Sequence, residues 1–174
     1  MTRKHSYQSI GVRLIALLAA CCGMGVAQVS AEPDSYTVYA LDSLGGTSSR
    51  GDGINNRGLA SGYSNLAGNT SRHAVTWLRG QMRDLGTLGG PNSSVVFAVK
   101  DDKGIVVGIS QTATPDTSGE IWSSGFFYPG PNNVGYVNLG FAWQNGQMRG
   151  LPTLGGIHGF AAGTRASPFR SRPD

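Results

Sequence analysis

Two stretches of the chain have nearly the same sequence, and they decide the fold that we predict. Residues 77–90 read WLRGQMRDLGTLGG, and residues 143–156 read WQNGQMRGLPTLGG. In both copies a Trp stands eleven residues before the Leu of the Leu-Gly-Gly triplet. Another triplet begins at Leu44, so the three triplets lie 44 and 66 residues apart. Self-similarity of this kind predicts a repeat architecture.

Each copy is predicted to form short β-strands. Residues 73–78, HAVTWL, are rich in β-branched and aromatic side chains, which favour strands. Arg79-Gly80, or Asn145-Gly146 in the next copy, predicts a two-residue hairpin turn, and Asn-Gly favours the positive φ that such turns need. Residues 81–85 then form the return strand. We interpret residues 88–92, LGGPN, as a loop because Gly-Gly-Pro should not continue a strand ladder, with further strands at 94–99 and 105–110.

Four short strands per repeat of about 44 residues match the size of one β-propeller blade. No helical period appears after the first 31 residues. We therefore predict an all-β fold of antiparallel four-stranded repeats, propeller-like but incomplete, with about two and a half blades. A single repeat buries too little apolar surface to be stable alone. The array is expected to be open-ended, marginally stable or completed by self-association.

Residues 1–31 have the pattern of a secretory signal peptide. Three basic side chains precede an apolar run at 14–20, LIALLAA, which is too short to span a bilayer. Cleavage after Ala31 is one processing route. A second route is a lipobox with lipidation of Cys21, and a third leaves an uncleaved anchor helix. We predict a secreted or cell-envelope protein, with a membrane contact only through the lipid anchor.

The formal net charge of +4 comes from the two ends of the chain. Of 14 basic residues, three lie in the leader and three in the last eleven residues, so that eight basic and nine acidic groups remain between them. The remaining cations are scattered singly along the sequence. Nucleic-acid binding needs clustered positive charge, so we exclude that class of partner.

The spacing between the second and third triplets contains extra residues. We place an insert at about 112–138 within a β-repeat domain at 32–163. Residues 112–119 are predicted to be a polar loop, and residues 125–140 resemble another, degraded hairpin. The tail at 164–174 lacks the repeat pattern and is predicted to be disordered. It has the character of out-of-frame coding or a truncated gene, which sequencing of the downstream reading frame would test.

These motifs resemble the HAF repeat family of bacterial extracellular repeats. The resemblance rests on the His73–Trp77 segment, on the Gly-Gln-Met to Leu-Gly-Gly run, and on residues 54–62, INNRGLASG. It covers about residues 36–163. It implies an exported or surface repeat protein, propeller-like, without an established activity and without catalytic residues to transfer. The low copy number and the end of the third copy after Gly163 depart from the family pattern.

The sequence contains no recognisable catalytic or metal-binding constellation. His73 and His158 are the histidines after the leader, and no metal-ligand spacing joins them. Asp101 and Asp102 beside Gly104 are better explained by a turn than by a calcium loop. Both cysteines lie in the leader, which leaves no thiol nucleophile after cleavage. We therefore expect neither enzymatic activity nor a cofactor.

Aromatic side chains in the insert are the candidate ligand-binding residues. Trp77 and Trp143 occupy equivalent repeat positions, which favours packing in the blade core over stacking on a ligand. The candidates that could stack on sugars or meet a partner are Trp122, Phe126, Phe127 and Tyr128. The alternative is that this segment packs on its neighbour.

The leading functional hypothesis is an exported surface or extracellular binding or structural module, with a glycan or a cell-surface protein as partner. A carbohydrate-binding accessory protein that uses the insert aromatics is the alternative. A hydrolase and a truncated paralogue without function are two further hypotheses.

Overall fold

A computed structural model describes residues 35–97, 102–119, 127–129 and 135–163. The chain divides into two units, Met1–Val38 and Tyr39–Asp174. The described residues of the first unit, 35–38, have no regular secondary structure. The predicted leader with Cys21 and the tail at 164–174 lie outside the described residues.

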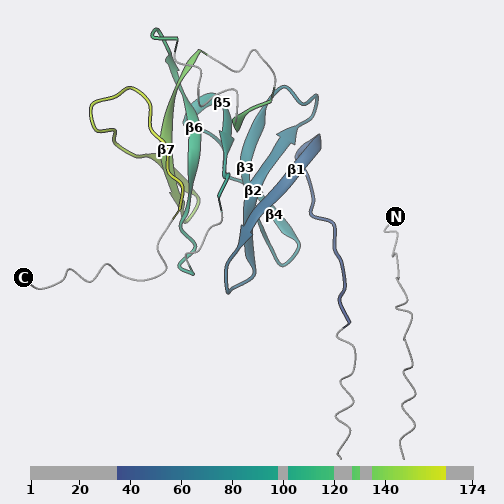
Figure 1. The fold of residues 1–174 in the computed structure, drawn as a ribbon. Helices are drawn as coiled ribbons and strands as arrows, with labels where there is room; N and C mark the ends of the chain where they lie inside the picture. Colours follow the sequence, from purple (N-terminus) through teal and green to yellow (C-terminus); the bar gives the residue numbers. More distant parts are fainter. Residues whose placement is uncertain (1–34, 98–101, 120–126, 130–134, 164–174) are drawn as a thin grey trace, which may run out of the picture. The chain divides into compact units, whose positions relative to one another are not determined.

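The second unit contains two four-stranded antiparallel sheets (Figure 1). In the first sheet, chain order equals neighbour order: β1 (Gly45–Ile54), β2 (Leu59–Leu66), β3 (Arg72–Leu78) and β4 (Gln81–Asp84). The second sheet repeats this order with β5 (Gly89–Ser94), β6 (Val106–Pro115), β7 (Tyr136–Gln144) and β8 (Gln147–Gly150). No helix lies entirely within the described residues, of which Phe127 alone has helical conformation. The predicted all-β fold of antiparallel four-stranded repeats is confirmed.

The predicted hairpin turns are also confirmed. Arg79 and Gly80 have φ of 51° and 78°, and Asn145 and Gly146 have φ of 53° and 85°. Positive φ at both turn positions matches the twist of the flanking strands. As a result the two hairpins have the same register, with each Trp opposite a Met on the return strand.

The prediction that residues 88–92 form a loop is wrong, because Gly89–Ser94 is strand β5. Pro91 lies inside a register shift between Gly89 and Ser93, where a residue without an N–H can be accommodated. A Cβ at Gly90 would lie 2.6 Å from both Gln111 Cβ and Thr112 O. Because residue 90 has no side chain, β5 can pack closely against β6. The strand predicted at 94–99 is also misplaced, since β5 ends at Ser94 and residues 95–97 are irregular.

The region interpreted as an insert is shorter than predicted. Residues 112–115 belong to β6 and residues 136–138 to β7, and Pro115 pairs with Tyr136. The predicted polar loop at 112–119 is therefore wrong in its first half. Residues 136–140 pair with β6 instead of forming the return strand of another hairpin. Strands β6 and β7, with ten and nine residues, are each only two residues longer than β2 and β3, so most of the extra length of this repeat lies between Pro115 and Tyr136.

Strand β5 joins the two sheets, because it also lies against β3 of the first sheet (Figure 1). The backbone N–H of Arg72 donates to Asn92 Oδ1 at 2.8 Å, and that of Ala74 donates to Ser93 Oγ at 2.8 Å. Beneath these bonds lies one apolar cluster from both repeats. Its buried members are Ala74, Leu85, Val95, Val106, Phe141 and Trp143.

The third Leu-Gly-Gly segment docks on β7 as β5 docks on β3. The backbone N–H of Asn138 donates to His158 Nδ1 at 3.0 Å. Asn138 and His158 occupy the repeat positions of Arg72 and Asn92, so this bond corresponds to the one between Arg72 N and Asn92 Oδ1. Leu151 N donates to Gly140 O at 2.7 Å, as Leu85 N does to Ala74 O at 3.0 Å. The repeat thus continues through Gly159, without regular strand structure.

Candidate functional site

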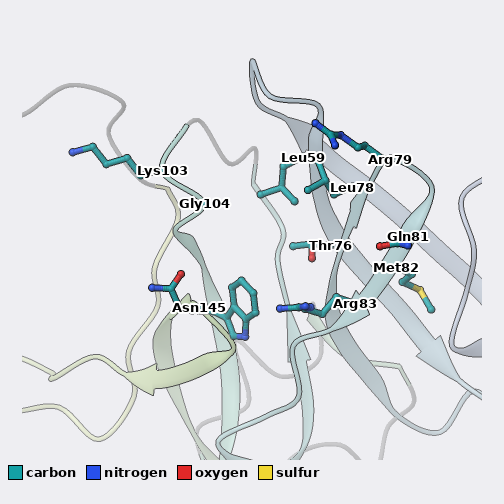
Figure 2. Close-up of a pocket in the computed structure, with 11 residues that line it drawn as sticks. Leu59, Thr76, Leu78, Arg79, Gln81, Met82, Arg83, Lys103, Gly104 and Asn145 are labelled. Atoms are coloured by element: carbon teal, nitrogen blue, oxygen red, sulfur yellow. The ribbon is translucent and has the colours of Figure 1, made fainter.

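A cleft of about 660 Å³ lies between the two sheets, beside the turns that end their strands (Figure 2). Its first wall comes from the β3–β4 hairpin and the start of β2. Its second wall comes from the turn before β6 and the end of β7. The described residues that line it are Leu59, Thr76, Leu78, Arg79, Gln81, Met82, Arg83, Lys103, Gly104, Trp143 and Asn145.

Strand pairing places the first wall. Thr76 lies opposite Arg83, and Leu78 lies opposite Gln81, so the side chains of each pair share a face of the hairpin. Arg79 lies in the turn between β3 and β4, at the end of the hairpin where Leu78 and Gln81 pair. Figure 2 shows Leu59, Thr76 and Arg83 directed toward the side of the cleft where Asn145 and Gly104 lie.

Tight turns place the second wall. Gly104 has φ of 80° and Asn145 has φ of 53°, conformations that glycine and asparagine accept most readily. Asp102 anchors the turn before β6 to the first sheet: Asn56 N donates to Asp102 Oδ1 at 3.1 Å and Asn56 Nδ2 donates to Oδ2 at 2.9 Å. The next residue, Lys103, lines the cleft.

The cleft is positively charged. Three cationic side chains, Arg79, Arg83 and Lys103, line it, and none of the described lining residues is acidic. Arg83 also lies over the Trp143 ring, 5.8 Å from its centroid, a weak cation–π contact across the junction of the sheets. No ion pair joins Arg79 or Arg83 to another described residue. Both guanidinium groups can therefore bind an added anion.

A smaller hollow of about 300 Å³ on the second sheet reproduces one wall of this cleft. The residues that line it are Ile105, Ala142, Gln144, Asn145, Gln147 and Arg149. In the same order, they occupy the repeat positions of Leu59, Thr76, Leu78, Arg79, Gln81 and Arg83. Among the described residues no further sheet supplies a second wall there. The recurrence of Arg83 as Arg149 is visible in the sequence, but it identifies a repeat position and not the cleft, which Arg149 does not line.

The insert aromatics predicted as ligand contacts occupy different environments. Trp122 and Phe126 lie outside the described residues. Phe127 and Tyr128 are buried, with 8% and 4% of their surfaces exposed, and they pack against Ile109. Tyr128 Oη donates to Asn138 Oδ1 at 3.1 Å, and burial raises the pKa of this phenol. The placement of these two rings agrees with the packing alternative.

Phe127 also belongs to an aromatic cluster at the surface. Its ring stacks on Phe160 at 5.3 Å between centroids, and Phe160 meets Phe97 edge-on at 5.8 Å. Phe97 and Phe160 are partly exposed. Phe97 follows β5, Phe127 lies between β6 and β7, and Phe160 follows the third triplet, so these contacts attach the segment after the third triplet to the second sheet.

Both histidines of the predicted β-repeat domain take part in contacts that hold the fold. His73 Nδ1 lies 2.8 Å from Asp84 Oδ2 across the β3–β4 hairpin. Burial tends to raise the pKa of Asp84, but hydrogen bonds from His73 and Gly86 N outweigh it, so the pKa lies below its usual value. His158 Nδ1 accepts the Asn138 N–H, and its Nε2 lies 3.4 Å from Asp116 Oδ2.

The described residues contain neither a cluster of metal ligands nor a helix that could span a membrane. Within this part of the chain, no three His, Cys, Asp or Glu side chains are grouped so that they could hold a metal ion. The same residues include no helix with the length and hydrophobicity required to cross a membrane.

Comparisons with protein-family models, with curated proteins and with solved structures gave no match to this chain. The candidate site therefore rests on the geometry of the cleft.

Proposed function

We propose that this chain is an exported repeat protein whose propeller-like sheets form a binding module, with the cleft between the sheets as the ligand site. The observation that carries the proposal is the lining of that cleft. Arg79, Arg83 and Lys103 line it together with apolar side chains, and none of its described lining residues is acidic. A concave site with a few converging polar groups is the usual form of a ligand pocket.

The propeller-like part of the proposal is supported by the way that the repeats stack. Propeller blades are four-stranded sheets set side by side around an axis. Here each sheet is an antiparallel meander, and the first strand of the second sheet lies against the first sheet. The third Leu-Gly-Gly segment repeats that contact on β7.

Binding, as opposed to catalysis, is supported by the state of the titratable groups. The described histidines each face an aspartate and belong to strand or segment contacts. Neither is among the described residues that line the cleft. The cleft offers guanidinium, ammonium, amide and hydroxyl groups, which can recognise a ligand but do not provide an acid–base pair.

Export rests on the sequence of residues 1–31 and is tested separately. Expression of the full chain in a bacterium, followed by cell fractionation, is expected to place the protein outside the cytoplasm. Recovery in the cytoplasmic fraction alone would contradict export and leave the binding part of the proposal unaffected.

The binding part is tested with arrays of immobilised glycans and peptides. The full chain should bind a discrete set of ligands, and Gln81→Trp should abolish this binding because the indole fills the cleft. Gln147→Trp is the matched control, since Gln147 holds the same strand position on the second sheet and lines only the smaller hollow. Equal effects of the two substitutions, or no binding by the unmodified chain, would contradict the proposal.

A further inference from the structure

We propose that the inter-sheet cleft binds an acidic oligosaccharide, a chain of sugar rings that carries carboxylate or sulfate groups. This inference rests on the proposed function, since it names the ligand of that same site. The cleft volume of about 660 Å³ falls within the range of small-molecule pockets. Its lining combines three kinds of group that such a ligand needs.

The first kind is positive charge. The described part of the chain contains seven Arg and Lys residues and five Asp residues. Three of those cations line the cleft, against none of the aspartates. Arginine presents its N–H donors as a planar fork that matches a carboxylate or a sulfate. A neutral ligand would leave this concentration of charge unexplained.

The second kind of group is apolar surface, and the third kind is uncharged amide and hydroxyl groups. Both suit the parts of a sugar ring that carry no charge. Leu59 and Leu78 provide partly exposed apolar surface on which the C–H faces of sugars pack. Gln81, Asn145 and Thr76 offer amide and hydroxyl groups that can pair with ring hydroxyls. A bare inorganic anion would use neither set, whereas an acidic sugar uses both.

A peptide is the competing ligand, because an extended peptide binds most readily by adding a strand to a free sheet edge. Strand β3 is paired on both sides, but β4, which contributes Gln81 and Arg83 to the cleft, is the free edge of the first sheet. The apolar and polar side chains of the lining favour a sugar, and the peptide arm of the test decides between the two. Nucleic acid is disfavoured because the other described cations, Arg50, Arg57, Arg72 and Arg149, do not line the cleft.

The test is calorimetric titration of the full chain at low ionic strength with oligogalacturonate, with a sulfated oligosaccharide of similar length, and with neutral malto-oligosaccharide. We expect binding of at least one acidic oligomer and binding of the neutral oligomer that is at least about tenfold weaker. Comparison of the carboxylated and sulfated oligomers identifies the acidic group. Affinity should fall as salt is added, because exposed charges are screened.

Variants locate the site. Arg79→Gln combined with Arg83→Gln should weaken acidic oligomer binding by about tenfold or more. Arg149→Gln, at the position of Arg83 on the second sheet, should change it by less than about twofold. Far-UV circular dichroism checks that each variant keeps its β-structure.

The outcomes separate this inference from the proposed function. If the neutral oligomer binds equally well, or if an acidic peptide or a single-stranded oligonucleotide binds more tightly, the assignment to acidic sugars is wrong. The binding module still stands in that case, provided that Gln81→Trp blocks the interaction. If no ligand binds in the titrations or on the arrays, both proposals fall.

Discussion

The second glycine of the Leu-Gly-Gly triplet is crowded in the first two copies and open in the third. A Cβ at Gly46 would lie 2.5 Å from Asn65 O, and one at Gly90 would lie 2.6 Å from Thr112 O. At Gly156 the nearest atom, His158 O, is 3.9 Å away. The glycine is thus required where a neighbouring strand crosses it, and the third copy lacks that strand among its described residues.

We therefore predict that Gly90→Ala destabilises the protein and that Gly156→Ala does not. The added methyl group at residue 90 must push β5 away from β6, at an expected cost of about 1–3 kcal/mol in the free energy of unfolding. Denaturant unfolding of both variants measures the difference. Equal stabilities would show that β5 does not press on β6 in solution.

A second residue-scale prediction concerns pH. Because the pKa of Asp84 is lowered in the fold, its ionised form contributes stability above the pKa of the unfolded chain, about 3.9. That contribution is lost as the pH falls through the lower folded pKa. Asp84→Asn should therefore reduce Tm at pH 7, by the equivalent of at most about 1 kcal/mol for this partly exposed pair. At pH 2 the two proteins should melt alike, and a difference independent of pH would contradict the argument.

At the scale of the elements, part of the fold was predictable from local sequence. The β3–β4 and β7–β8 hairpins depend on turn residues with positive φ, and the sequence contains that information in Gly80 and in Asn145-Gly146. Strand β5 was not predictable in this way. Its Gly-Gly-Pro sequence disfavours a strand locally, and tertiary contact with β6 and β3 overrides that preference.

The cleft was harder to predict for the same reason. Its walls come from segments around residues 59, 76–83, 103 and 143–145, which only the packing of two sheets brings together. Single cations in turns are ordinary in a sequence, and their convergence is a property of the junction. By contrast, the aromatic side chains of the insert stood out in the sequence because they are large and apolar. The two that the structure describes, Phe127 and Tyr128, are in fact buried.

The junction itself gives an element-scale prediction. Asn92 accepts the Arg72 N–H and donates to Gln111 Oε1, both at 2.8 Å, and its side chain is fully buried. Asn92→Ala removes both bonds and leaves buried groups unsatisfied, so it should cost about 2 kcal/mol in the free energy of unfolding. Ser48→Ala, at the same position of the first triplet, is the matched control. No hydrogen bond joins the Ser48 side chain to another described residue, so this substitution should change the free energy of unfolding by less than about 0.5 kcal/mol.

At the scale of the whole molecule, the apolar cluster binds the two sheets into one folding unit. Ala74 lies in the first sheet, Leu85 follows it, and Val106, Phe141 and Trp143 lie in the second sheet. Neither sheet can bury these side chains without the other, as is usual for repeat units that share an interface. A change in the second sheet should therefore destabilise the first sheet as well.

Phe141→Leu tests this coupling. Phe141 is fully buried, and the smaller side chain should reduce the free energy of unfolding by about 1–2 kcal/mol while the protein still folds. Amide hydrogen exchange should then report faster exchange in β3 of the first sheet as well as in β6 and β7, with a single unfolding transition. Leu154→Ala, at a fully exposed position, should leave exchange unchanged. Faster exchange confined to the second sheet would mean that the sheets unfold independently, in which case the cleft between them would not persist as a rigid binding site.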